Sequence, residues 1–156
     1  MPSIIKITAK SFTLVETLLI VGIFSTLAVI LIPFSIQQLN QNRCENSARQ
    51  FLGKLFSQQQ NAASQLNNLS YGVEVKTNSF VVFEGENSDN YSYSQEITFE
   101  NGVTVSATNL TGGGSKIFFS KGEIMPTSYG KITIGDSAST YIVSINSEGM
   151  MHYYRQ

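Results

Sequence analysis

The fold of this chain is decided by residues 10–34, KSFTLVETLLIVGIFSTLAVILIPF. The stretch begins with a lysine, passes through the hexapeptide SFTLVE (residues 11–16), and has no charged residue between positions 18 and 32. Only one glycine and two hydroxyl-bearing residues interrupt the aliphatic and aromatic side chains there. With the apolar residues just before it, the run has roughly the 20 residues that cross a hydrocarbon core of about 30 Å. The sequence therefore predicts a membrane-spanning helix.

One carboxylate, Glu16, lies inside this apolar segment. An ionisable side chain at membrane depth costs a few kcal/mol, so a functional role with a specific partner is the first interpretation. A secretory signal peptide has a shorter apolar core and a small-residue cleavage site, whereas residues 32–35, IPFS, make a poor cleavage site. A plain signal anchor fits the length of the segment but leaves Glu16 without a role.

Residues 11–16 resemble the processing motif of type IV pilins and type II secretion pseudopilins. In that family the prepilin peptidase cuts before the phenylalanine and methylates the new amino terminus. The resemblance thus implies cleavage between Ser11 and Phe12, N-methylation of Phe12, and use of Glu16 in filament assembly. Ser11 stands where the family usually has glycine. Pro33 falls where many family members carry a proline, and we expect it to bend the helix, with Gly22 as a second weak point.

The segment before the motif, residues 1–11, forms a short leader with two lysines and no acidic residue. Positive charge beside a first apolar helix keeps that side in the cytoplasm. We therefore expect a single-pass inner-membrane protein with its N-terminus in the cytoplasm and its head outside, found in a pilus or pseudopilus after assembly.

Beyond the transmembrane and assembly helix (residues 12–34), residues 35–69 continue the helical pattern. Their apolar side chains recur at spacings of three and four, which is typical of one face of an amphipathic helix. The opposite face is rich in Gln and Asn. The apolar positions are Leu39, Ala48, Phe51, Leu52, Leu55, Ala62, Leu66 and Leu69.

The remaining residues, 70–156, change to short β-branched and aromatic runs separated by turn residues, which indicates an antiparallel β head. The predicted fold is therefore α+β, with a long N-terminal helix packed on an antiparallel sheet. Asn101-Gly102 is the strongest hairpin signal, and residues 85–95 and 108–115 are expected to be loops. The predicted strands are residues 71–76, 80–84, 97–100, 103–106, 116–119, 123–125, 131–134, 140–145 and 150–154.

Composition gives no support for an enzyme, a cofactor or a metal site. The chain has one cysteine and one histidine, Cys44 and His152, more than a hundred residues apart, so no catalytic or metal-ligating set is evident. Residues 111–116, TGGGSK, lack the spacing of a phosphate loop and are interpreted as a flexible turn. Cys44 cannot form an internal disulfide and is interpreted as an ordinary helix residue, with an intermolecular bridge as the lesser alternative.

Net charge gives no indication of nucleic-acid binding, because the 10 basic and 11 acidic residues leave the chain at −1. The tail at residues 152–155, HYYR, does combine aromatic and basic groups that can hold single-stranded nucleic acid. Some members of the resembling family bind DNA during uptake, so DNA is retained as a weakly supported partner.

The resemblance implies a structural filament subunit whose partners are the prepilin peptidase, other pilin or pseudopilin subunits, the inner-membrane assembly machinery and the lipid bilayer. An all-β head after the helix is similar to minor pseudopilins of the H group. Major pilins more often carry a disulfide loop, which this chain cannot form; a disulfide-free major subunit is the other option. The alternative function is a membrane-tethered extracytoplasmic binding module, with DNA as one candidate ligand.

Overall fold

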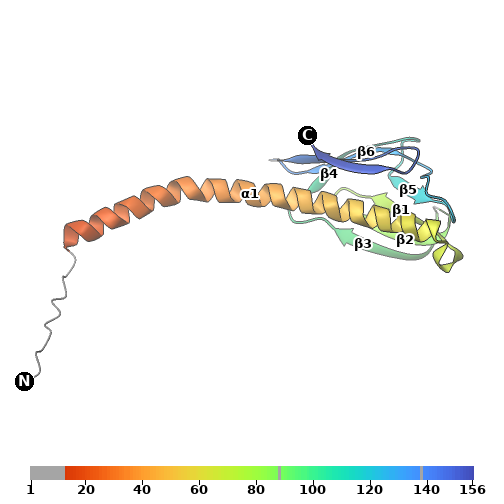
Figure 1. Cartoon of the computed structure of the whole chain (residues 1–156), viewed down its shortest axis with the longest axis horizontal. Coiled ribbons are helices and arrows are strands. Elements are labelled where there is room, and N and C mark those ends of the chain that lie inside the picture. Colours follow the sequence, from red (N-terminus) through yellow and green to blue (C-terminus); the bar gives the residue numbers. More distant parts are fainter. Residues whose placement is uncertain (1–12, 88, 138) are drawn as a thin grey trace, which may run out of the picture. The chain divides into compact units, whose positions relative to one another are not determined.

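A computed structural model describes residues 13–87, 89–137 and 139–156 of the chain (Figure 1). The chain forms two compact units, Met1–Gln37 and Gln38–Gln156. Helix α1 (Leu14–Ala63) contributes to both. The expected leader, residues 1–11, lies outside the described residues, and so do the expected cleavage and methylation positions, Ser11 and Phe12.

Helix α1 begins with a side-chain cap in the first unit. The backbone N–H of Glu16 donates to Oγ1 of Thr13 at 3.3 Å, and the backbone N–H of Thr17 donates to the Thr13 carbonyl at 3.2 Å. Threonine at this position satisfies a donor that the first helical turn leaves without a partner. The helix assignment continues through Gly22 and Pro33. A bend at these two residues stays a prediction.

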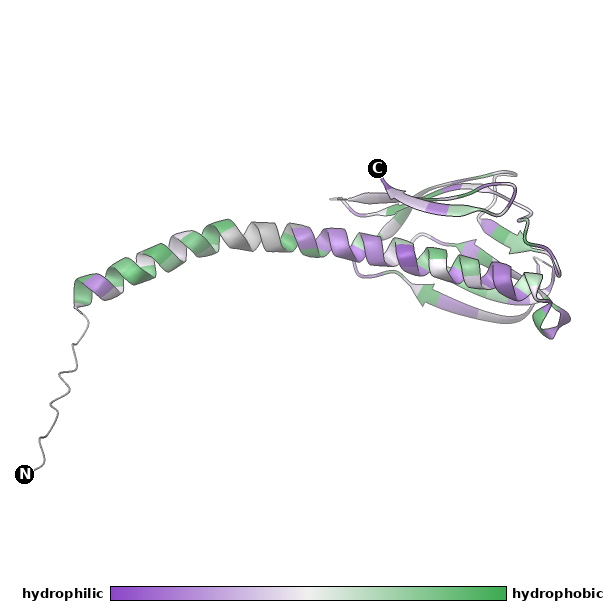
Figure 2. Ribbon diagram, viewed as in Figure 1, coloured by the Kyte–Doolittle hydropathy of each residue, from purple (hydrophilic) through white to green (hydrophobic). Residues whose placement is uncertain are grey.

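The prediction that the first half of this helix spans a membrane is corrected by the structure. Within residues 13–87, 89–137 and 139–156, no helix combines the length and the apolar character that crossing a bilayer requires. Figure 2 shows this part of α1 as mainly hydrophobic with hydrophilic positions among the apolar ones.

The second unit contains two antiparallel four-stranded sheets where the sequence had suggested one. The first sheet has the strand order β3-β2-β1-β5 and the second has the order β4-β6-β7-β8. The strands are β1 (Ser70–Val75), β2 (Ser79–Asn87), β3 (Asn90–Thr98), β4 (Thr104–Leu110), β5 (Lys116–Phe119), β6 (Gly130–Gly135), β7 (Thr140–Ile145) and β8 (Met151–Arg155). The strands predicted at residues 71–76 and 80–84 are confirmed, and they pair with each other as β1 and β2.

The Asn101-Gly102 turn explains why there are two sheets. The hairpin predicted around it is wrong, because β3 pairs with β2 while β4 pairs with β6. Gly102 has a φ of +89°, so the turn itself forms. Phe99, two residues before the turn, and Val103, directly after it, are both buried in the hydrophobic core. Because both of these side chains enter the core, the chain leaves the first sheet at this turn and joins the second.

Three further local predictions are wrong. Residues 108–110, which were expected to begin a loop, form the end of β4. Residues 85–95 were expected to be a loop but form the ends of β2 and β3, whose turn is held by Oδ1 of Asn87, the acceptor for the N–H groups of Asp89 and Asn90. Residues 123–125 were expected to be a strand, but only an isolated bridge between Phe119 and Pro126 forms there.

Helix α1 ends at Ala63, before the boundary expected at residue 69. Gln65, Asn67 and Asn68 have positive φ values of 54°, 51° and 61°. This left-handed conformation cannot continue an α-helix, and asparagine adopts it more readily than most residues. A short 3-10 turn, η1 (Leu66–Asn68), then leads into β1.

The core forms where one face of α1 meets both sheets. The helix supplies five apolar residues with no exposed surface, spaced four, three, four and seven positions apart, as one helical face requires. The Phe51 ring meets the Phe80 ring edge-on at 5.1 Å, and Phe80 lies 5.3 Å from Phe99. Leu39 and Leu66, expected on the buried face, are exposed. The five buried helix residues are Cys44, Ala48, Phe51, Leu55 and Ala62.

Candidate functional site

Glu16 lies in the first turn of α1 on an exposed part of the helix. Thr13 and Glu16 have the T-x-x-E spacing of a capping box, in which the glutamate stabilises the helix start. A carboxylate in the first turn also interacts favourably with the helix dipole. The signature of this local role was present in the four residues Thr13-Leu14-Val15-Glu16 but was not among the predicted features.

The large apolar residues on both sides of Glu16, from Leu14 to Ile30, remain exposed in the first unit. Leu14 is 80% exposed and Phe24 is 68% exposed. An apolar surface of this extent marks a site of contact with another molecule. The large exposed side chains are Leu14, Val15, Leu18, Leu19, Ile20, Val21, Ile23, Phe24, Leu27, Val29 and Ile30.

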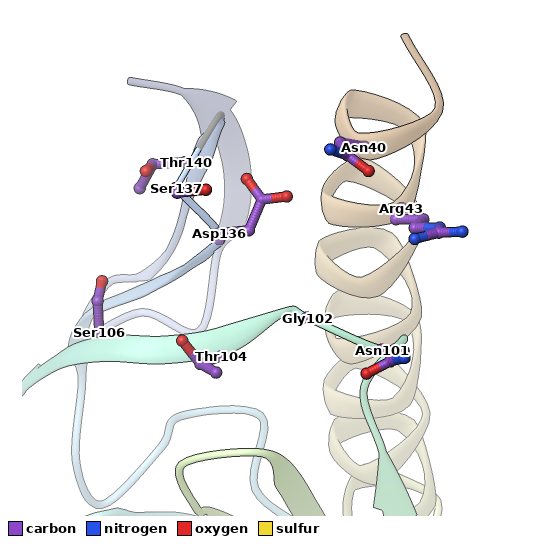
Figure 3. A pocket seen from close by; sticks show the side chains of 10 residues that line it. Asn40, Arg43, Asn101, Gly102, Thr104, Ser106, Asp136, Ser137 and Thr140 are labelled. Atoms are coloured by element: carbon purple, nitrogen blue, oxygen red, sulfur yellow. The ribbon is translucent and has the colours of Figure 1, made fainter. Parts of the chain in front are cut away.

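The second unit has a polar pocket of about 500 Å³ between α1, the Asn101-Gly102 turn and the β6–β7 turn (Figure 3). Asn40 and Arg43 line it from the helix, and Asp136 lies across from them. Its lining offers hydrogen bonds and one charge of each sign, but no nucleophile with a histidine base. Such a pocket can bind a polar group. The other lining residues are Asn101, Gly102, Thr104, Ser106, Gly135, Ser137 and Thr140.

Cys44 is fully buried in the core, next to Ser139 and Asp136. Burial raises the pKa of the Cys44 thiol above its ordinary value, and the nearby Asp136 carboxylate acts in the same direction. A thiol in these surroundings reacts slowly. The interpretation of Cys44 as a helix residue without chemistry fits this position.

The tail at residues 152–155 lies in β8. The Tyr153 ring packs 6.4 Å from the Tyr141 ring, and the Arg49 guanidinium lies 5.7 Å from its centroid. Arg49 also pairs with Glu45 at 2.5 Å. Tyr153 therefore packs within the fold. The other three tail side chains are exposed, and DNA binding by them stays a prediction.

The glycine-rich stretch of residues 111–116 is a turn, as interpreted from its spacing. Gly112 and Gly113 have φ values of +88° and +72°. Oγ1 of Thr111 donates to the Tyr129 carbonyl at 2.7 Å and accepts from the Tyr129 N–H at 2.9 Å, which fixes the turn to the neighbouring chain. Strand β5 rather than a helix follows, so no phosphate-binding helix N-terminus forms here.

Comparison of the chain with protein-family models, curated proteins and solved structures finds no match. Among the residues that the structure describes, no group of three or more His, Cys, Asp or Glu side chains could hold a metal ion. The features that bear on function are therefore the motif at residues 11–16, the position of Glu16 and the exposed apolar surface around it.

Proposed function

We propose that this chain is a structural subunit, and specifically a minor one, of a type IV pilus or type II secretion pseudopilus. In this proposal the prepilin peptidase cuts between Ser11 and Phe12, and the subunit assembles through its N-terminal helix. The observation that carries the proposal is Glu16, which lies in the first turn of a helix whose large apolar side chains remain exposed. The absence of a second cysteine favours a minor subunit.

Apolar contacts supply the adhesion between subunits. The exposed side chains of residues 14–30 are covered in the filament by the same segments of neighbouring copies. Each Å² of apolar surface removed from water contributes about 25 cal/mol. This attraction is non-directional, so it does not fix how one helix lies along the next. A second interaction has to set the register.

In this proposal, an ion pair made by the Glu16 carboxylate fixes how one helix lies along the next. Cleavage frees an α-amino group on Phe12, which titrates near 7.7–8.0 in ordinary surroundings and stays cationic after methylation. In this proposal Glu16 pairs with the Phe12 amine of a neighbouring copy. Removing one partner of a buried ion pair typically costs about 3–5 kcal/mol.

Helix capping is the competing explanation for Glu16. A capping box accepts glutamine as well as glutamate at this position, whereas an ion pair requires the charge. Glu16→Gln therefore separates the two roles. Glu16→Val removes both, and Glu16→Asp keeps the charge on a shorter side chain.

The experiment measures, for all four forms, the ratio of protein in sheared filaments to protein retained with the cells. Glu16→Gln and Glu16→Val should both enter filaments poorly, and Glu16→Asp should be intermediate. Intact-mass analysis is the control, because every form should have lost residues 1–11 and gained one methyl group. If Glu16→Gln assembles as well as the parent chain, the ion pair is wrong and capping explains Glu16. If the parent chain never enters a filament, the filament function is wrong.

A further inference from the structure

Strand β3 forms an edge of the first sheet that no other described strand covers. Among the described strands it pairs only with β2, and most of its nine residues are exposed (Figure 1). The opposite edge, β5, is covered, because the Thr127 N–H donates to the Phe118 carbonyl at 2.8 Å and the Ser128 hydroxyl donates to the Lys116 carbonyl. Native edge strands are protected by charged side chains (lysine above all), by proline and by bulges, which discourage pairing with other chains. From Tyr93 to Thr98, β3 has no lysine, proline or bulge, and its one charge is that of Glu96.

The pairing of β3 with β2 defines its two faces. Tyr93, Gln95 and Ile97 lie opposite Glu84, Val82 and Phe80 respectively. Val82 and Phe80 belong to the hydrophobic core, so these β3 side chains share the face that α1 covers. Ser94 and Glu96 point to the other face. The register shifts between Glu84 and Gly85, which leaves Ser92 unpaired, so the regular part of β3 begins at Tyr93.

We propose that β3 pairs antiparallel with β3 of a second copy of this chain, around a two-fold axis at Gln95. An axis at Glu96 would place two carboxylates opposite each other, which is unfavourable. An axis at Ser94 would extend the ladder into the irregularity at Ser92. An axis at Gln95 pairs only residues of the regular part of β3, which begins at Tyr93. It also places the faces that α1 covers in the two copies on the same side of the joined sheets.

The residue pairs in this register are complementary. Gln95 faces its own copy, and two side-chain amides can donate to and accept from each other. Tyr93 faces Ile97, which is an aromatic and β-branched pair of the kind that stabilises antiparallel ladders. Ser94 faces Glu96, so the only charge on the strand meets a hydroxyl group. This self-complementarity favours a second copy over an unrelated peptide.

A small groove beside β3 needs a hydrogen-bond donor. It measures about 180 Å³ and lies between α1 and the covered face of β2 and β3, lined by Gln58, Tyr93 and Gln95 among others. Gln58 is 9% exposed, and its Oε1 has no donor within the described part of the chain. A buried acceptor without a donor is costly. In the proposed dimer, Gln95 and Tyr93 of the second copy lie on the same face of the joined sheets as this groove. Their amide and hydroxyl groups are therefore candidate donors for Gln58 Oε1.

Cysteine cross-linking of the full-length chain tests the register. Gln95→Cys places two thiols opposite each other at the axis, within the Cα separation that a disulfide allows. Tyr93→Cys is the matched control, because it lies on the same strand and face but is about 13 Å from its own copy. The parent chain gives the background, since its one cysteine, Cys44, is buried.

After mild oxidation, Gln95→Cys should give at least a fivefold higher yield of disulfide-linked dimer than Tyr93→Cys on a non-reducing gel. Equal yields would indicate random collision and overturn the proposal, as would a Gln95→Cys yield no higher than that of the parent chain. A higher yield for Tyr93→Cys would mean another register and would also overturn it. The measurement needs no filament, so its result is independent of the proposed assembly function.

Discussion

The side-chain nitrogen of Gln59 on α1 lies 2.8 Å from the carbonyl oxygen of Gly149, a residue 90 positions further along the chain. The same nitrogen donates to the Ile124 carbonyl, also at 2.8 Å. One amide group thus fixes two separate turns to the helix. Its neighbour Gln58 is equally buried, yet its Oε1 has no donor among the described residues. The two adjacent glutamines form a matched pair for mutation.

Gln59→Met should lower the free energy of unfolding by about 2–4 kcal/mol, because two buried carbonyl groups lose their donor. Gln58→Met, with the same side-chain length, should change it by less than about 1 kcal/mol or raise it, since the buried Oε1 has no hydrogen bond to lose within the described part of the chain. Urea unfolding of both variants and the parent chain measures the difference. Equal losses for the two variants would contradict the assigned hydrogen bonds.

Gly149→Ala should be more destabilising than Gly102→Ala. Both glycines have positive φ values, +81° and +89°, so each alanine carries a conformational strain of about 1–2 kcal/mol. A Cβ at Gly149 would also lie 2.3 Å from the Ile124 carbonyl oxygen, whereas a Cβ at Gly102 has nothing within 4 Å. Thermal unfolding of the two variants, side by side, should give the lower midpoint for Gly149→Ala. A midpoint as low for Gly102→Ala would show that crowding at Gly149 is unimportant.

Phe51→Ala should cost about 3–5 kcal/mol of stability, as expected when a fully buried ring is removed from a packed core. Phe56→Ala, one and a half turns further along the same helix, should cost less than about 1 kcal/mol, because the Phe56 ring is half exposed. Chemical denaturation compares them. A loss for Phe56→Ala close to that for Phe51→Ala would place the buried face of α1 elsewhere.

Alkaline pH should destabilise the chain partly through Cys44. Burial raises the pKa of this thiol, so above about pH 8.5 the unfolded chain loses the proton before the folded chain does. The folded state then binds more protons, and its stability falls as pH rises. The free energy of unfolding, measured at several pH values between 7.5 and 10, should fall less steeply for Cys44→Ala than for the parent chain. Identical slopes would contradict this contribution.

The sequence predicted those parts of the head in which side chains alternate between core and solvent. Strand β7 has the burial alternation of a half-buried strand, and the prediction for residues 140–145 matches it. The face of α1 through Ala48, Phe51 and Leu55 was predicted for the same reason. In both cases the periodic pattern is caused by a single buried face.

Other features had no such signal. Strand β3 is exposed along nearly its whole length, so its Ser, Asn and Tyr residues looked like a loop. The division into two sheets depends on the burial of Phe99 and Val103 on either side of a turn that usually makes a hairpin. The role of Thr13 at the start of α1 was present in the sequence but was obscured by the interpretation of Glu16 as an assembly residue.

The assignment of β5 to the first sheet has a consequence for the order of folding. β4 precedes β5 and β6 follows it, yet both belong to the second sheet. During synthesis the first sheet therefore remains incomplete until Phe119 has emerged, and by then β4 is waiting for a partner that has not been made. The first sheet cannot be completed until after β4 of the second sheet has been made. Such interleaved, long-range pairing slows folding.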